Sequence, residues 1–540
     1  MCPRKFRRVS CLALIFVLVG FLLVFPTSAY GLLLNTDLSN ANASFIGERD
    51  TALSGWSVAS AGDVNRDGYD DFLVGAVGDS EGGGLSYGQT YLILGKATAD
   101  WGKKFDLGNA NASFIGEQWG WSGNSVASAG DVNNDGYDDF LIGAPLLMSG
   151  FVAGKAYLIL GKADADWGND VNLANADASF ISETWNWSGW SVASAGDVNG
   201  DGYDDFLIGA PTDGTGGTTA GKTYLILGKA NGWVKNFDLV NANFSFIGER
   251  DDAYSGRSVA SAGDVNGDGR DDFLIGAHKD TEGGTDAGKT YLILGKAAPD
   301  WGKDFNLANA DASFIGEDAD DLSGFSVASA GDVNRDGYDD FLIGASGDEE
   351  GGLNAGKTYL ILGKANGWVK NFNLVNADFS FIGEDADDAS GTSVASAGDM
   401  NSDGYDDFLI GASGDEEGGL DAGKTYLILG KADADWGKDF NLVNADASFI
   451  GEDADDCSGT SVASAGDVNG DGRDDFLIGA PFDSEGGSSA GQTYLLLGTA
   501  PPVGGEVYYV NKGNVLAPWL VLAAAIIAGG IILRRRISQG

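Results

Sequence analysis

One stretch of the sequence decides the fold: Ser191-Val-Ala-Ser-Ala-Gly-Asp-Val-Asn-Gly-Asp-Gly-Tyr-Asp-Asp-Phe-Leu-Ile-Gly-Ala-Pro211. Its opening heptapeptide, Ser-Val-Ala-Ser-Ala-Gly-Asp, occurs seven times, and successive copies are 66 to 68 residues apart. The aspartates that end these copies are Asp63, Asp131, Asp197, Asp264, Asp332, Asp399 and Asp467. The repeated units fill residues 34–500, so we expect this region to be one repetitive domain.

Each unit contains four short runs that favour strands over helices. In the first unit they are residues 57–61, 72–76, 90–94 and 113–116, which are rich in β-branched and aromatic residues and bounded by Gly, Asp and Asn. The second and third runs are apolar on both faces, as expected for sheets covered on both sides. Four antiparallel strands in each of seven units predict an all-β fold, a seven-bladed β-propeller of four-stranded blades.

The ends of the array distinguish this propeller from an open solenoid. The last unit stops after residues 493–497 and lacks a fourth strand, whereas a matching strand, residues 44–48, precedes the first unit. This offset would let the N-terminal strand complete the last sheet and close the ring. A linear solenoid would need atypical capping repeats, and the sequence shows none. We therefore expect a propeller closed by its N-terminal strand.

Between its first and second strands, every unit carries the motif Asp-x-Asn-x-Asp-Gly-x-Asp-Asp. Positions 1, 3, 5 and 9 offer side-chain oxygens, position 7 offers a carbonyl, and the glycine at position 6 allows a sharp turn. An EF-hand would have a glutamate at position 12, where this chain has an apolar strand residue such as Val74. Ordinary Asp/Asn/Gly turns, which need no metal, are the alternative. The complete set in all seven units favours Ca²⁺, and Mg²⁺ less, because Mg²⁺ gives up its water reluctantly.

We therefore predict up to seven Ca²⁺ ions, one in each blade. The position-7 residues contribute their main-chain carbonyls rather than their side chains. The predicted metal ligands are Asp63, Asn65, Asp67, Tyr69, Asp71, Asp131, Asn133, Asp135, Tyr137, Asp139, Asp197, Asn199, Asp201, Tyr203, Asp205, Asp264, Asn266, Asp268, Arg270, Asp272, Asp332, Asn334, Asp336, Tyr338, Asp340, Asp399, Asn401, Asp403, Tyr405, Asp407, Asp467, Asn469, Asp471, Arg473 and Asp475.

The order Gly-x-Ser-Val-Ala, Gly-Asp-x-Asn-x-Asp-Gly and Asp-Phe-Leu-Ile-Gly-Ala-Pro resembles the FG-GAP repeat of integrin α-subunit propellers. The resemblance implies a seven-bladed propeller with calcium in hairpin loops on one face and partners bound on the other. Integrin-like propellers hold metal in only some blades, whereas this chain has the motif in all seven. The chain shows no inserted ligand-binding domain, no immunoglobulin-like leg domains and no disulfide pairs. We therefore expect a prokaryotic surface protein rather than one subunit of an animal receptor.

Composition narrows the classes of function. The chain has 33 Lys and Arg against 79 Asp and Glu, a net charge of -46, which excludes a protein that neutralises nucleic-acid phosphates. One histidine and three cysteines leave little for zinc sites, catalytic imidazoles or a disulfide framework. Paired carboxylates are abundant, but most belong to the predicted calcium loops. We expect no enzymatic activity, and a glycan hydrolase or lyase is the remaining alternative.

The turns on the face opposite the metal loops differ between units, and variation on one face of a repeated scaffold often marks recognition. Early units carry aromatic residues there, whereas the last three repeat Asp-Ala-Asp-Asp. We predict an extracellular protein or glycan partner; the alternatives are surface drift with local packing of the tryptophans, and an envelope or matrix component without a ligand. The predicted partner-binding residues are Trp56, Trp119, Trp121, Trp185, Trp187, Trp190, Arg257 and Phe325.

Tryptophans also recur at even spacing on the side of the metal loops. This regularity is more typical of structural plugs between blades than of ligand contacts. The six residues are Trp101, Trp167, Trp233, Trp301, Trp368 and Trp436.

The two ends of the chain predict export and anchoring. Residues 1–29 combine a basic start, an apolar run and a small-residue site, which predicts a signal peptide cleaved after Ala29, with an uncleaved anchor as the alternative. Residues 515–533 are apolar and precede three arginines, which predicts a transmembrane helix with a cytoplasmic basic tail, residues 534–540. A sorting signal or a core-buried helix are its alternatives. With residues 501–514 as a linker, we expect the propeller at the cell surface, anchored in the cytoplasmic membrane.

Overall fold

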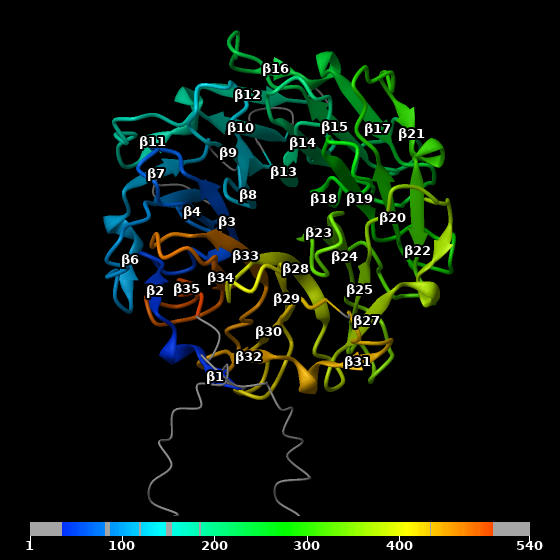
Figure 1. Ribbon diagram of the computed structural model, residues 1–540. Helices are drawn as coiled ribbons and strands as arrows, with labels where there is room; N and C mark the ends of the chain where they lie inside the picture. The colour runs from blue at the N-terminus through cyan, green and yellow to red at the C-terminus, as the bar shows by residue number, and fades with distance from the viewer. Residues whose placement is uncertain are drawn as a thin grey trace, which may run out of the picture. The chain divides into compact units, whose positions relative to one another are not determined.

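The computed structural model describes residues 35–80, 87–117, 120–146, 154–182, 185–432 and 434–499. These residues belong to one compact unit and form seven five-stranded sheets arranged in a ring (Figure 1). We number the sheets blades 1 to 7 in the order of their first strands. The described residues contain no α-helix, and no helical segment in them is long and apolar enough to cross a membrane. The predicted signal peptide, linker, transmembrane segment and basic tail lie outside the described residues.

The first strand of each blade carries the repeated Ser-Val-Ala-Ser-Ala-Gly sequence and lies beside the first strands of the neighbouring blades, around the centre of the ring (Figure 1). Small side chains allow this close approach, and the Ser57 hydroxyl accepts a hydrogen bond from Val126 N–H of the next blade (3.0 Å). The first strands are β3 (Ser54–Gly62), β8 (Ser125–Gly130), β13 (Ser191–Gly196), β18 (Ser258–Gly263), β23 (Ser326–Gly331), β28 (Ser390–Gly398) and β33 (Ser461–Gly466).

The second and third strands are buried along their whole length, because a neighbouring blade covers each face. The second strands are β4 (Asp71–Ala76), β9 (Asp139–Ala144), β14 (Asp205–Ala210), β19 (Asp272–Ala277), β24 (Asp340–Ala345), β29 (Asp407–Ala412) and β34 (Asp475–Ala480). The third strands are β5 (Gln89–Ile93), β10 (Lys155–Ile159), β15 (Lys222–Ile226), β20 (Lys289–Ile293), β25 (Lys357–Ile361), β30 (Lys424–Ile428) and β35 (Gln492–Leu496).

The predicted fourth strands are present, but each blade has a fifth strand, so the prediction of four-stranded blades was wrong. The fifth strand has only two residues and pairs in parallel with the fourth. The fourth strands are β2 (Ala43–Ile46), β7 (Ala112–Ile115), β12 (Ala178–Ile181), β17 (Phe244–Ile247), β22 (Ala312–Ile315), β27 (Phe379–Ile382) and β32 (Ala447–Ile450). The fifth strands are β1 (Thr36–Asp37), β6 (Phe105–Asp106), β11 (Val171–Asn172), β16 (Phe237–Asp238), β21 (Phe305–Asn306), β26 (Phe372–Asn373) and β31 (Phe440–Asn441).

A single-turn 3₁₀ helix follows each fifth strand. The Asp or Asn that ends the strand caps this turn: the Asp37 carboxylate, for example, accepts a hydrogen bond from Ser39 N–H (2.8 Å). The turns are η1 (Leu38–Asn40), η2 (Leu107–Asn109), η3 (Leu173–Asn175), η4 (Leu239–Asn241), η5 (Leu307–Asn309), η6 (Leu374–Asn376) and η7 (Leu442–Asn444).

The N-terminal strands belong to the last two blades. Strand β2 pairs antiparallel with β35, with Phe45 opposite Thr493, and so supplies the fourth strand of blade 7. Strand β1 pairs in parallel with β32 and supplies the fifth strand of blade 6. The strand that the last unit lacks is therefore provided by the residues expected from the sequence.

The hydrophobic core lies between successive blades. One cluster joins Phe72 and Tyr91 of blade 1 to Leu477 and Leu495 of blade 7, and six further clusters repeat this arrangement around the ring. The six evenly spaced tryptophans pack against these clusters; Trp101, for example, contacts the rings of Phe45 and Phe72 edge-on. Their predicted role as plugs between blades is confirmed.

Candidate metal loops and divergent face

The predicted metal loops are the hairpin turns between the first and second strands. In blade 1 the loop runs from Asp63 to Asp70, between β3 and β4. Asp63 accepts hydrogen bonds from Asp67 N–H (3.0 Å) and Gly68 N–H (2.9 Å), and Gly68 adopts a φ of +90°. The same contact from position 5 to the position-1 carboxylate recurs in all seven loops. These hydrogen bonds hold the backbone of each loop around its position-1 carboxylate.

The position-9 aspartate anchors each loop to its sheet. Asp71 is fully buried, and its two oxygens accept hydrogen bonds from Gly95 N–H (2.8 Å) and Val64 N–H (3.1 Å). Burial raises the pKa of Asp71 to about 8; the Gly95 hydrogen bond opposes this shift, and the nearby carboxylates of Asp67 and Asp63 add to it. A divalent cation would reduce the repulsion among these carboxylates.

Two loops contain oxygens that fit a cation directly. The side-chain oxygens of Asn334 and Asn401, at position 3 of the loops in blades 5 and 6, are buried and accept no hydrogen bond from the described residues. A buried oxygen without a donor is costly unless it meets a positive charge. Carboxylate and amide oxygens around one turn are the donors that Ca²⁺ prefers, so the residues present fit this ion.

In blades 4 and 7 the position-7 side chain enters the loop. Arg270 contacts the Asp268 carboxylate at 3.1 Å, and Arg473 contacts the Asp471 carboxylate at 3.1 Å. Both carboxylates occupy position 5, which is a predicted ligand position. The other five loops have tyrosine at position 7. The prediction considered position 7 only for its carbonyl and missed this competing positive charge.

The position-8 aspartates, which the prediction did not single out, join neighbouring blades. The Asp138 carboxylate of blade 2 accepts a hydrogen bond from Asp63 N–H of blade 1 (2.9 Å). The glycine before Asp63 makes room for this contact, because a Cβ on Gly62 would lie 2.3 Å from the carboxylate. The contact repeats at all seven joints, and Asp70 accepts it from Asp467 N–H between blades 7 and 1 (2.8 Å). These joint aspartates are Asp70, Asp138, Asp204, Asp271, Asp339, Asp406 and Asp474.

A separate acidic cluster outside these loops is paired with lysine and arginine side chains. Glu249, Asp280 and Glu282 bring carboxylate oxygens close together. Lys289 contacts Glu249 and Glu282, and Arg250 contacts Glu282 at 2.7 Å and Asp280 at 3.4 Å. These side chains neutralise the cluster, so it does not favour an additional metal.

The predicted partner-binding residues divide into exposed and packed groups. Trp185 is 68% exposed and Trp121 is 38% exposed. Trp187 stacks on Trp190 with ring centroids 5.2 Å apart, and Trp56 contacts Phe482 edge-on at 6.5 Å. The Arg257 guanidinium lies over Trp190 at 5.0 Å and over Phe325 at 4.6 Å. The structure thus brings four of the predicted residues together and pairs Trp56 with blade 7, while Trp119 lies outside the described residues.

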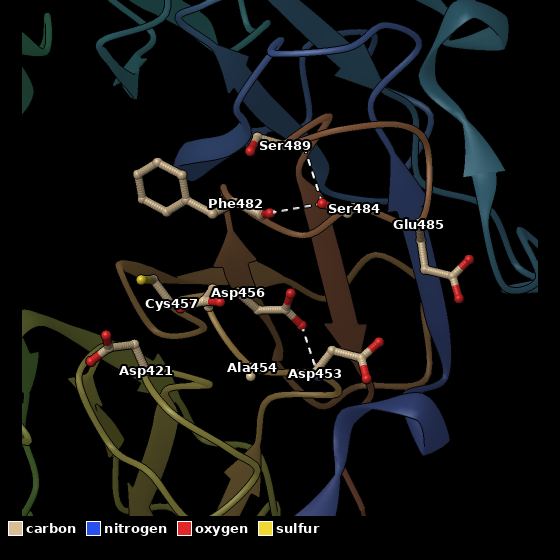
Figure 2. A pocket seen from close by; sticks show the side chains of 10 residues that line it. Asp421, Asp453, Ala454, Asp456, Cys457, Phe482, Ser484, Glu485 and Ser489 are labelled. Carbon is tan, nitrogen blue, oxygen red and sulfur yellow. Dashed lines mark hydrogen bonds between the residues drawn. The ribbon is translucent and has the colours of Figure 1, made fainter.

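One of the three acidic turns, residues 453–456, lies beside a hollow of the surface. A cavity of about 720 Å³ is lined by carboxylates and by Cys457 and Phe482. Figure 2 shows Asp421 from blade 6 and Asp453 and Asp456 from the turn that leads into blade 7. Asp456 is buried and accepts a hydrogen bond from Asp453 N–H (2.9 Å). Burial raises its pKa to about 7, despite that hydrogen bond.

The seven repeated units match a known protein family. The family described as FG-GAP repeat matches seven segments, residues 54–92, 122–159, 188–226, 255–293, 323–361, 390–428 and 458–496. Each segment begins at the first strand or three residues before it, crosses the candidate metal loop and ends in the third strand of one blade. The chain belongs to the FG-GAP repeat family.

Proteins similar to this FG-GAP chain include integrins. Integrin alpha pat-2 of Caenorhabditis briggsae is 31% identical over 237 residues, which are 42% of this chain and 18% of that protein. Integrin alpha-5 of Xenopus laevis is 31% identical over 235 residues, 42% of this chain and 20% of that protein. The resemblance to integrin α propellers that the motif predicts is therefore confirmed.

An enzyme is also among the similar proteins. Phosphatidylinositol-glycan-specific phospholipase D of Bos taurus is 31% identical over 228 residues, 42% of this chain and 26% of that protein. The matches thus span 18% to 26% of the length of these three relatives. Because the FG-GAP region matches proteins named as integrins and one named as a phospholipase, family membership alone does not separate binding proteins from enzymes.

Proposed function

We propose that this FG-GAP propeller is a calcium-loaded adhesion or recognition protein that binds an extracellular protein or glycan through the face opposite its metal loops. The exposed indoles of Trp121 and Trp185 carry the proposal. Large exposed aromatic side chains are costly in water and are enriched where proteins bind partners. They lie in turns that differ between otherwise near-identical blades.

Calcium would be held by positions 1, 3, 5, 7 and 9 of each loop. When bound, it would supply positive charge to carboxylates that otherwise repel one another. The position-1 and position-9 aspartates orient the loop through their backbone contacts. The arginines in blades 4 and 7 compete with the ion, so we propose five stronger and two weaker sites.

The same proposal places the propeller outside the cell. Its support is the sequence of residues 1–29 and 515–533, which predicts a signal peptide and a membrane anchor or sorting signal. Cys457 is free, and the described residues contain no disulfide, which favours a prokaryotic surface over an animal one. Export also brings the loops into contact with the higher calcium concentrations outside cells.

A binding function is favoured over catalysis. The single histidine, His278, packs between the rings of Tyr254 and Phe325, with no nucleophile bonded to it among the described residues. Most paired carboxylates belong to the metal loops or to ion pairs with lysine and arginine. The alternative function is a structural envelope component without a ligand. The exposed indoles of Trp121 and Trp185 favour a binding function instead.

Binding of the full chain to cells and to an immobilised glycan panel, in millimolar calcium, tests the proposal. We expect the double variant Trp121→Ala and Trp185→Ala to bind at least tenfold more weakly. The matched control is Leu353→Ala and Leu420→Ala, which removes two exposed apolar side chains, each 58% exposed, from the glycine-rich turns of blades 5 and 6. Equal binding by the wild type and both double variants would refute the proposed face. No binding by the wild type would favour the structural alternative.

A further inference from the structure

A row of contacts between flat side chains crosses three blades on the divergent face. Trp190, Arg257 and Phe325 occupy the equivalent position just before the first strands β13, β18 and β23. Trp187 stacks on Trp190 at an interplanar angle of 19°, and the Arg257 guanidinium lies between Trp190 and Phe325. His278 contacts the Phe325 ring at 5.6 Å. We call these five residues the Arg257 stack.

Arg257 has no anionic partner in this stack. Among the described residues no carboxylate lies within ion-pair distance of its guanidinium, and its side chain makes no hydrogen bond with them. The side chain is nevertheless half-buried, and this burial lowers the pKa of Arg257 to about 10, so it keeps its charge at neutral pH. In a chain with 79 acidic and 33 basic residues, an unpaired and partly buried cation is unusual.

The geometry restricts what Arg257 can bind. Two aromatic rings lie close to the guanidinium, and its N–H groups donate no hydrogen bond to the described residues, so these groups remain for a ligand. A guanidinium edge presents parallel donors that match the two oxygens of a carboxylate. Cation–π contacts hold the group in place, so little further ordering is needed when an anion binds.

His278 adds a second unused group at the same place. It is 7% exposed, and its Nδ1 atom has no hydrogen-bond partner among the described residues. Burial, together with the charges of Arg257 and Lys279, lowers the pKa of His278 to about 3, so the imidazole is neutral at physiological pH. A buried polar atom without a partner is costly and fits a site that a ligand completes. Lys279 lies over the Tyr254 ring at 5.8 Å, but its charge is paired with the Asp286 carboxylate at 3.9 Å, so Arg257 is the cation that a ligand would meet here.

We propose that the Arg257 stack is the subsite for a sugar acid, whose carboxylate binds the edge of Arg257. This inference rests on the proposed recognition function and names its ligand class. A sugar ring is favoured over an acidic peptide because the turn that carries Trp187 also carries the exposed Trp185. Indole faces stack on the apolar face of a pyranose ring, whereas an acidic peptide side chain offers no such face.

Three defined probes and the full chain in millimolar calcium test the proposal: hexagalacturonate, the uncharged galactose hexamer and a hexaglutamate peptide. We expect the wild type to bind hexagalacturonate at least tenfold more tightly than either other probe. Arg257→Gln should weaken hexagalacturonate binding about 10- to 100-fold, since a charge-assisted bidentate contact is lost. Arg257→Lys should restore only part of the affinity, because lysine lacks the planar edge.

Arg335→Gln is the matched control, because Arg335 also lies over an aromatic ring, that of Tyr405, but in a metal loop. It should leave hexagalacturonate binding unchanged. Thermal midpoints of all variants in calcium show whether each ring is intact. Tighter binding of hexaglutamate than of hexagalacturonate would overturn the sugar-acid assignment in favour of an acidic peptide. Equal hexagalacturonate binding by the wild type and Arg257→Gln would overturn the subsite, even where binding to cells persists. A wild type that binds no probe, with Arg257→Gln merely less stable, would show that the stack serves packing alone.

Discussion

Replacing Phe45 by alanine tests whether strand β2 holds blade 7 together as firmly as fourth strands hold the other blades. Phe45 is fully buried and its ring contacts those of Phe72 (5.2 Å), Trp101 (6.4 Å) and Phe105 (5.7 Å). The repeat provides a matched control in Phe246 of blade 3. Phe246 is equally buried and contacts Phe273 (5.3 Å), Trp301 (5.8 Å) and Phe305 (5.7 Å).

The two substitutions should destabilise the propeller by the same amount. Each removes a fully buried phenyl ring from a cluster between two blades, which costs about 3–5 kcal/mol in unfolding free energy. The partners across the strand pair also match, because Phe45 lies opposite Thr493 and Phe246 lies opposite Thr223. Two differences remain. Blade 3 has Phe244 packed on Trp301 (5.2 Å) where blade 7 has Ala43, and β2 is separated from its partner strand by most of the chain, whereas the fourth strand of blade 3 follows its partner directly.

Urea unfolding in saturating calcium provides the measurement. With a common dependence on urea, equal losses of free energy appear as equal shifts of the unfolding midpoint. We expect the midpoint shifts of Phe45→Ala and Phe246→Ala to agree within about a quarter. If Phe246→Ala shifts the midpoint strongly and Phe45→Ala hardly does, strand β2 does not stabilise the ring and the reasoning from its pairing is refuted.

The remaining predictions concern calcium, the joints and pH. At roughly 2 mM Ca²⁺ and a Kd of about 10⁻⁴ M, each occupied site adds about 1.8 kcal/mol to the unfolding free energy. The thermal midpoint should therefore rise with calcium and not with magnesium. Equal midpoints in calcium and in chelator would contradict this. Arg270→Tyr and Arg473→Tyr should convert two weak sites into strong ones, and titration calorimetry showing unchanged affinities would contradict the proposed competition. Asp138→Ala leaves the Asp63 N–H without its acceptor and should cost about 1–3 kcal/mol, whereas the exposed Asp164→Ala should cost almost nothing. Burial raises the pKa of Asp321, Asp388 and Asp456 to about 7, above the unfolded value, so their contribution to stability is present at low pH and lost as pH rises through 7. The triple variant with asparagine at these three positions should therefore lose less unfolding free energy than the wild type between pH 5 and pH 8. Parallel profiles of unfolding free energy against pH would contradict the raised pKa values.

Sequence reasoning predicts the strands well because each is a short apolar run between glycine and acidic residues, and the structure places β4 and β5 within one residue of the predicted runs. It misses the fifth strands because two residues carry no periodic pattern. Phe105 and Asp106 pair with β2, which lies in another part of the chain, so nothing local marks them as a strand. Strands that form within one unit have a recognisable sequence pattern. A strand that forms only by pairing with a distant segment of the chain has none.

The joint aspartates show the same limit. Asp70 and Asp71 are adjacent and identical in type, yet Asp71 accepts hydrogen bonds within its own blade and Asp70 accepts one from blade 7. A motif assigns both to one acidic loop, because the direction in which each carboxylate points depends on the packing of two blades. The arginine contacts in blades 4 and 7 were missed for a related reason: only the folded loop brings the position-7 side chain back to position 5.

Because β2 pairs with β35, blade 7 can be completed only near the end of synthesis of the propeller. Strand β2 is among the first parts of the propeller to be made, but its partner is nearly the last. The roughly 450 intervening residues take roughly 20–90 s to assemble at about 5–20 residues per second. During that time β2 exposes unpaired backbone N–H and C=O groups, which invite pairing with other chains. Its brevity, four residues, limits the area available for such contacts until blade 7 is complete.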